Sequence, residues 1–129
     1  MVEVTMVPGS GVDVVREMFE AWNAHDLAAV YDHLSEDYTE YINGGIAKRS
    51  RAEAQELDQV LYDTVPDYTR TVEELWGVGD RVAARFIISG TMRDGRRFEL
   101  AIAGIFGVTG GRVIEAHLFF DPAAAVDPR

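Results

Sequence analysis

The residues 112–121 carry two side chains that together could move a proton. His117 and Asp121 fall on the same side of an alternating strand, together with Glu115. An imidazole beside a carboxylate is a common arrangement for general acid–base chemistry. In a second interpretation, this side of the strand faces outward and Asp121 caps the turn that begins at Pro122. Alternation alone does not decide between the two, and we favour the second.

Other reactive side chains form no recognisable centre. The chain contains no cysteine, which excludes disulfides, thiol catalysis and thiolate metal sites. Its three histidines, His25, His33 and His117, share no ligand spacing with a carboxylate on a common face. We therefore expect neither a bound metal nor a cofactor.

Composition narrows the classes of partner. The chain of 129 residues has 12 basic and 22 acidic side chains, a net charge of -10, which argues against nucleic acid and anionic membranes. No signal peptide and no apolar stretch of about 20 residues is visible, so we expect a cytoplasmic protein. The length fits one domain, which we place at residues 12–126 after a loose arm at residues 1–11.

Helical periodicity in the first half predicts three helices that would position these side chains. Asp26 is a suitable N-cap for the second helix. Ser50 and Glu53 form a capping box that begins the third, which ends before Pro66. The three apolar stripes are Val15, Met18, Phe19 and Trp22; Leu27, Val30, Tyr31 and Leu34; and Ala54, Leu57 and Leu61.

Strands account for the remainder. A short aromatic and β-branched run at residues 38–43 ends at Gly44-Gly45. After Pro66 the apolar period becomes two, and glycine-containing hairpin turns interrupt it three times. The order of elements predicts an α+β domain in which helices pack on one face of an antiparallel sheet. The four predicted strands of the meander are 69–78, 81–92, 96–108 and 112–121.

Three stretches of the chain carry a wider resemblance: FEAWNAHDLAAVYDHLSEDYTEYING, the helix start SRAEA, and GTMRDGRRFELAIAGIFGVTGGRVIEAHLFFDPAAA. They resemble the nuclear-transport-factor-2-like superfamily, and within it the SnoaL-like polyketide cyclases, limonene epoxide hydrolase and ketosteroid isomerase. The resemblance spans Val12 to Val126. It implies a cone-shaped curved antiparallel sheet packed on three N-terminal helices.

The resemblance also implies which strand faces line a pocket. It places Glu40 and Arg85 inside the cone as catalytic candidates. Alternation supports the assigned face in the last strand, but in residues 81–92 both faces are apolar. The pocket is expected to be deep, mostly apolar and suited to a small hydrophobic molecule. Its implied substrate-binding residues are Met18, Trp22, Tyr38, Ile42, Leu57, Leu61, Ile87, Ser89, Leu100, Ile102, Ala116, Leu118 and Phe120.

With this assignment, Glu40 and Arg85 are the two ionisable side chains in an otherwise apolar cone. An unpaired buried charge costs several kcal/mol, so we expect the two to meet within hydrogen-bond reach. As a functional pair, Glu40 would serve as acid or base and Arg85 would anchor a substrate oxygen. As a structural pair, they would hold one strand against another. Both interpretations stay open.

The chain departs from these relatives at their catalytic positions. The residues on which ketosteroid isomerase depends fall at Met18, Ile42 and Gly104, which argues against that chemistry. Of the Asp-Arg-Asp set of limonene epoxide hydrolase, only Arg85 survives. Two classes of function fit what is left. One is a cyclase or isomerase of secondary metabolism that acts on a polyketide-like or polycyclic substrate; the other is a non-catalytic binding or carrier protein of the same fold.

An apolar outer face predicts assembly. A monomer would expose a patch larger than soluble proteins usually tolerate, and members of this superfamily commonly pair through the convex face of the sheet. We therefore expect a homodimer. The residues assigned to this patch are Val82, Ala84, Phe86, Ile88, Ala101, Ala103 and Ile105.

Overall fold

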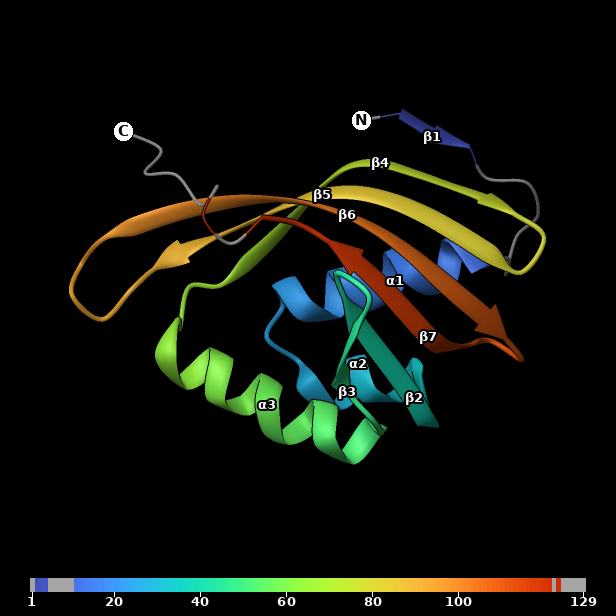
Figure 1. The fold of residues 1–129 in the computed structure, drawn as a ribbon, viewed down its shortest axis with the longest axis horizontal. Helices are drawn as coiled ribbons and strands as arrows, with labels where there is room; N and C mark the ends of the chain where they lie inside the picture. Colours follow the sequence, from blue (N-terminus) through green and yellow to red (C-terminus); the bar gives the residue numbers. More distant parts are fainter. Residues whose placement is uncertain (1, 5–10, 122, 124–129) are drawn as a thin grey trace.

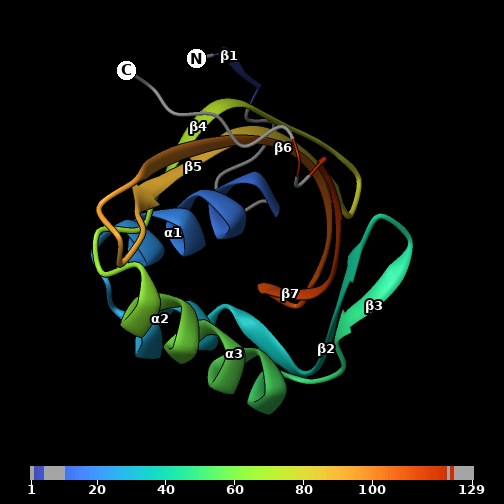
Figure 2. The same ribbon diagram turned by 60° about the vertical axis from the view of Figure 1, so that its left-hand side comes forward.

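The computed structural model describes residues 2–4, 11–121 and 123 of the chain. The strands form one sheet in the order β1-β4-β5-β6-β7-β2-β3, and the helices lie on its concave side (Figure 1, Figure 2). Along the chain, the elements are β1 Val2–Val4, α1 Gly11–Asn23, α2 Leu27–Asp32, β2 Leu34–Ile42, β3 Gly45–Lys48, α3 Arg51–Thr64, β4 Thr69–Val78, β5 Arg81–Thr91, β6 Arg97–Thr109 and β7 Arg112–Phe119.

This architecture confirms the predicted α+β class and the curved sheet packed on three helices. Strands β4 to β7 form the expected antiparallel meander. Its turns contain glycines with positive φ, among them Gly79 at +60° and Gly95 at +88°. Two pairings are parallel instead: β1 with β4, and β2 with β7. Reasoning from hairpins could not find the second, because α3 and four strands separate β2 from β7 in the chain.

Three segments differ from the sequence prediction. Leu34 begins β2 instead of ending the second helix, which stops at Asp32. The turn after Ile42 returns the chain as the additional strand β3. Val2–Val4, expected within a loose arm, pairs with β4. Residues 5–10 and most of the predicted turn after Asp121 lie outside the described residues.

β-Bulges bend the sheet. The register shifts between Val72 and Glu74 in β4, and between Gly107 and Val108 in β6. Each bulge bends its strand and increases the local twist. The sheet therefore curls around α1, as Figure 2 shows.

In the described part of the chain, no helix has both the length and the apolar character needed to cross a bilayer.

Helix α1 fills the concave side of the sheet. Its predicted stripe is confirmed, because Val15, Met18, Phe19 and Trp22 are each no more than 4% exposed. The Phe19 ring meets the Phe86 ring edge to face, with centroids 4.8 Å apart. Burial of a side chain of this size stabilises the fold by about 1.5–3 kcal/mol. This packing sets the face that β5 presents to the core.

The predicted faces of β5 are wrong by one residue. Val82, Ala84 and Phe86 point inward and are at most 5% exposed, so Arg85 points outward. Phe86 pairs in register with Ile102, which is buried, and cross-strand partners share a face. A slip of one residue moves every side chain of a strand to the other face. Both faces of this strand are apolar, so the sequence pattern does not show which face is buried. Packing against α1 determines it.

The convex face still carries an apolar patch, although its membership changes. The predicted members Val82, Ala84 and Phe86 are interior. In their place, β4 and β7 contribute large exposed side chains. We define the convex patch as Trp76, Ala101, Ala103, Ile105 and Phe119, of which Trp76, Ile105 and Phe119 are 45%, 45% and 48% exposed.

We predict a homodimer that buries the convex patch, because monomers rarely expose such a surface. Light scattering at micromolar concentration should give twice the chain mass of 14.3 kDa. Ile105→Glu would place a charge in the patch and should shift the protein toward monomer. The matched control is Leu57→Glu, at a side chain that is 46% exposed on α3. A monomeric wild type would contradict the prediction.

Candidate functional site

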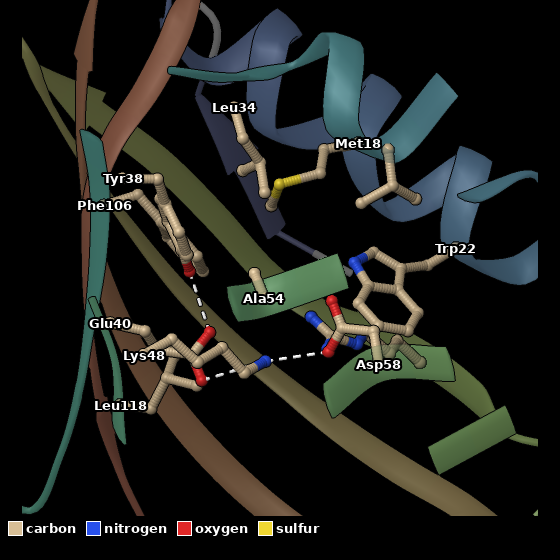
Figure 3. A pocket seen from close by; sticks show the side chains of 12 residues that line it. Met18, Trp22, Leu34, Tyr38, Glu40, Lys48, Ala54, Asp58, Phe106 and Leu118 are labelled. Atoms are coloured by element: carbon tan, nitrogen blue, oxygen red, sulfur yellow. Dashed lines mark hydrogen bonds and ion pairs between the residues drawn. The ribbon is translucent and has the colours of Figure 1, made fainter. Parts of the chain in front are cut away.

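A small cavity lies on the concave side of the sheet, where β2, β3 and α3 approach α1 (Figure 3). Its volume is about 20 Å³, and a single water needs about 10–15 Å³. The expected deep apolar pocket is therefore wrong for this structure. The cone is instead filled, and five of the lining side chains are polar: Tyr38, Glu40, Lys48, Asp58 and Arg70.

Glu40 reaches the cavity from β2. It pairs in register with Ala116 of β7, which is fully buried, so both residues face the concave side. Tyr38, two residues earlier, points the same way, and its hydroxyl donates a hydrogen bond of 2.8 Å to Glu40 Oε1. Burial and the neighbouring carboxylate raise the pKa of Tyr38 well above its ordinary value. The phenol therefore stays protonated and acts as a donor.

Lys48 enters the cavity because β3 contains a bulge. Glu40 pairs with Lys48, and Tyr41 pairs with Ile46. Ala47, which lies between Ile46 and Lys48, therefore has no partner in the ladder. The bulge brings the Lys48 side chain to the same face as Glu40. Its Nζ lies 3.2 Å from Glu40 Oε2 and 2.8 Å from Asp58 Oδ1. One ammonium group therefore bridges two buried carboxylates.

Asp58 is positioned by α3, which begins at the predicted cap. Ser50 Oγ accepts a hydrogen bond of 3.0 Å from the Glu53 N–H. The helix then buries Ala54, Asp58 and Tyr62 at intervals of four residues, which places them on one face. An acid thus occupies the centre of the buried stripe of the helix.

Burial dominates the electrostatics of the Asp58–Lys48 pair. It raises the pKa of Asp58 above the ordinary value, and the Lys48 ammonium offsets this only in part. Burial lowers the pKa of Lys48, but the carboxylates of Glu40 and Asp58 outweigh it, so the net pKa is raised and the ammonium stays charged. The Tyr31 hydroxyl lies 3.5 Å from Asp58 Oδ2. A carboxyl group with a raised pKa in a cavity is a candidate for proton transfer.

Arg70 reaches the cavity from β4 and is 9% exposed. Its guanidinium carbon lies over the Trp22 ring, 4.0 Å from the centroid. The rings of Phe19, Tyr68 and Phe86 are 5.5, 5.5 and 5.8 Å away. A cation over an aromatic face gains about 0.5–2 kcal/mol. Aromatic rings therefore compensate in part for the burial of this charge.

Asn23, the last residue of α1, holds the backbone of Arg70. Its Oδ1 accepts from the Arg70 N–H at 2.8 Å, and its Nδ2 donates to the Arg70 carbonyl at 2.7 Å. The guanidinium itself is held less completely. Within the described residues, its Nε has no hydrogen-bond partner, and the guanidinium forms no ion pair.

The cavity gathers two carboxylates and two cations. Glu40 and Asp58 balance Lys48 and Arg70, which lowers the cost of burying all four. Glu40 is a carboxylate that can accept a proton, and Asp58 is a carboxyl group whose pKa is raised. These are the components of general acid–base chemistry.

Comparison with known proteins identifies the family. Residues 15–116 match the profile of the SnoaL-like domain. The chain belongs to the SnoaL-like domain family. This confirms the resemblance noted in the sequence. No curated protein sequence matches the chain significantly.

Solved structures share the fold of this SnoaL-like domain. IdmH from Streptomyces antibioticus, a proposed polyketide cyclase, is 24% identical over 88% of this chain and 93% of its own, with a TM-score of 0.77. AclR from Streptomyces galilaeus, a proposed hydroxylase, is 24% identical over 86% and 88%, with a TM-score of 0.76. An LEH-like epoxide hydrolase from M. tuberculosis is 18% identical over 86% and 82%, with a TM-score of 0.77. Identities this low show the fold alone.

The predicted pair of Glu40 and Arg85 does not form in this SnoaL-like domain. Glu40 is inside the cone as expected, but Arg85 lies on the outer face of β5 with its side chain 55% exposed. Arg85 Nε donates to Glu74 Oε1 at 2.9 Å, and its Nη1 lies 3.7 Å from Glu73 Oε1. The cause is the one-residue error in the faces of β5. Lys48 takes the place that Arg85 was expected to fill.

Four predicted substrate-binding residues line the cavity: Met18, Trp22, Tyr38 and Leu118. Figure 3 shows the indole nitrogen of Trp22 turned toward it. Leu57 is 46% exposed on α3, because the buried stripe of that helix runs through Asp58 instead. The predicted residues that do not line the cavity are Ile42, Leu57, Leu61, Ile87, Ser89, Leu100, Ile102, Ala116 and Phe120.

Sequence reasoning missed Lys48, Asp58 and Arg70. Asp58 carries a detectable signal, because it lies one helical turn after Ala54 on the buried stripe. Arg70 also carries a signal. It lies two residues after Tyr68, which is buried, so alternation along the extended chain that leads into β4 places both side chains on the same face. Lys48 carries none, since its orientation depends on a bulge that composition does not reveal.

His117 and Asp121 have partners other than each other. The His117 ring stacks on Tyr41 with centroids 4.6 Å apart, and its Nε2 lies 3.0 Å from Glu115 Oε2. Asp121 accepts a hydrogen bond of 2.9 Å from the Ala123 N–H. His117 pairs in register with the exposed Ile105, so the interpretation of an outward face is confirmed. The turn that Asp121 is expected to cap lies mostly outside the described residues.

A larger open hollow of about 520 Å³ lies outside the cone, between the end of α3 and the β5–β6 hairpin. The Asp67 carboxylate at its edge accepts from the Thr91 N–H at 2.8 Å and from the Thr91 hydroxyl at 2.7 Å. These hydrogen bonds lower the pKa of Asp67. We interpret Asp67 as a tie between the α3–β4 connection and β5.

We predict that Lys48→Met strongly destabilises the fold. The change leaves the buried carboxylates of Glu40 and Asp58 without their shared countercharge, and breaking a buried pair costs about 3–5 kcal/mol. Arg85→Met is the matched control; it removes an exposed pair and should cost less than about 1 kcal/mol. Urea unfolding measures both. Adding Glu40→Gln to Lys48→Met should recover part of the loss, and equally small losses in both single variants would contradict burial of the cluster.

Asp58 should make the stability of the fold depend on pH. Since its folded-state pKa is raised, its stabilising contribution is complete below the ordinary value of 3.8 and is lost as the pH rises through the folded-state pKa. Asp58→Asn cannot titrate. The free energy of unfolding of wild type minus that of Asp58→Asn should therefore fall as the pH rises above the ordinary value of 3.8. Urea titrations measure this, with Asp63→Asn as a control on the same helix; a difference that rises with pH would refute the raised pKa.

Proposed function

We propose that this SnoaL-like domain binds a small organic molecule beside Glu40, Lys48 and Asp58 and transfers a proton on it, in an isomerisation or a cyclisation. The observation that carries the proposal is the Lys48 ammonium between two buried carboxylates at 3.2 and 2.8 Å. The ammonium keeps a proton acceptor and a carboxyl group of raised pKa close to the same cavity. Arg85, which lies outside the cone, has no part in the proposal.

The reaction begins with Glu40 as the base. It takes a proton from a carbon next to a carbonyl group, and the electron pair of the C–H bond moves into the carbonyl to give an enolate. Lys48 supplies a fixed positive charge beside this anion. In an isomerisation, the substrate carries a C=C bond next to this carbon, so the anion is a dienolate, and Glu40 returns the proton to its γ-carbon. In a cyclisation, the enolate carbon attacks a second carbonyl of the molecule, and the alkoxide formed takes the proton.

The lining supports a substrate with an apolar body. Met18, Leu34, Phe106 and Leu118 surround the polar groups. The described cavity of about 20 Å³ has room for about one water, whereas sites for drug-sized ligands measure about 300–1,000 Å³. Even a small substrate must therefore displace lining side chains. A polyketide-like or polycyclic substrate, which the resemblance implies, would require α3 to move outward. The apolar lining is compatible with either size.

Exchange of substrate hydrogens with solvent tests the proton transfer. A panel of small cyclic enones and β-keto esters is incubated with the protein in heavy water, and the loss of C–H signals is followed by proton NMR. Glu40→Gln should slow the exchange by about 10²–10⁴-fold, the usual contribution of a general base. Glu56→Gln, an exposed change on α3, is the matched control and should exchange as fast as wild type.

The alternative is a non-catalytic binding or carrier protein of the same fold. One observation favours it: Glu40 already accepts hydrogen bonds or ion pairs from Tyr38 and Lys48, so both of its oxygens are occupied. If wild type binds members of the panel but exchanges none of them, the carrier is the correct assignment and the catalytic proposal is rejected.

A further inference from the structure

Arg70 carries a buried charge that the proposed proton transfer does not use. It lines the cavity, is 9% exposed, and its Nε–H meets no acceptor within the described residues. The other cation of the cavity, Lys48, holds both carboxylates at 3.2 Å or less. A cation in a buried place gains most from an anion that touches it. An anionic group on a ligand would find that contact at Arg70.

The surroundings of Arg70 leave its N–H groups as the surface for a ligand. The guanidinium lies over the Trp22 ring at 4.0 Å, so one of its faces is taken. Asn23 holds the Arg70 backbone through both the N–H and the carbonyl. The Tyr68 side chain also interacts with the guanidinium. The Nε–H, which has no partner within the described residues, and the adjacent N–H donors in the plane of the guanidinium are left for a ligand. A planar fork of this kind matches the two oxygens of a carboxylate, whereas a neutral carbonyl offers one oxygen.

We infer that Arg70 binds the carboxylate of the ligand, so that the substrate class is a small organic acid. The inference that this acid is a substrate rests on the proposed function, whereas the binding of a carboxylate does not. An added anion would give the cavity one excess negative charge. Asp58, flanked by Lys48 and Tyr31, can remove this excess by taking up a proton, because burial already raises its pKa.

Acetate and acetamide form a matched pair of probes, because they share a shape and differ in charge. Each is titrated into ¹⁵N-labelled protein, and the Arg70 Nε–H signal is followed by NMR. Acetate should shift this signal and bind about tenfold or more tightly than acetamide, as a charge-assisted hydrogen bond predicts. Arg70→Met should weaken acetate binding by about tenfold or more. Arg85→Met, on the outer face, is the matched control and should leave it unchanged.

Circular dichroism first checks that Arg70→Met is folded. If it is not, the acetate–acetamide comparison on wild type decides, together with Arg70→Lys, which keeps the charge and loses the planar fork and should weaken acetate binding. Equal affinity of the two probes, no binding of either, or acetate affinity retained in a folded Arg70→Met would overturn the inference. If acetate binds through Arg70 but the protein catalyses no hydrogen exchange, this inference stands, the catalytic proposal is rejected, and the protein is a carrier of organic acids. Exchange on neutral ketones without acetate binding would overturn this inference alone.

Discussion

The contact on which the candidate site depends is the Lys48 ammonium between Glu40 and Asp58. It links helix α3 to the hairpin formed by β2 and β3. Each carboxylate alone would be expensive to bury, and the lysine alone would be driven to solvent. Together they form a polar centre that lines the cavity. The same contact that holds α3 against the sheet therefore also assembles the reactive groups.

The buried charge of Arg70 is stabilised in a different way from that of Lys48. Lys48 forms ion pairs with both carboxylates. Arg70 feels the same carboxylates without an ion pair, and it is surrounded by aromatic rings and held through its backbone by Asn23. Ring quadrupoles stabilise a cation without neutralising it. The guanidinium therefore keeps a positive field in the cavity, while the lysine charge is largely cancelled. Two cations in one small space thus have different capacities to attract a ligand.

The sequence predicted the elements far better than the orientation of side chains. The stripe through Phe19 and Trp22 and the cap at Ser50 were readable, because local spacing determines them. The outward position of Arg85 was not, because both faces of β5 are apolar and only packing against α1 distinguishes them. Lys48 was hidden for a related reason, since a bulge formed by pairing with β2 sets its direction. What local pattern cannot supply is the register between distant strands.

The unpaired Ala47 has a consequence for how this site can change over evolution. It is the extra residue that lets Lys48 face the interior. If β3 paired regularly with β2 and kept Ala47, that alanine would lie opposite Glu40 and the lysine would turn to the outside, with no substitution in the chain. Glu40 and Asp58 would then lose the countercharge that they share. Gain and loss of the polar centre among related chains can therefore follow from a change in the pairing register of one short hairpin, and a comparison that counts only substitutions would overlook it.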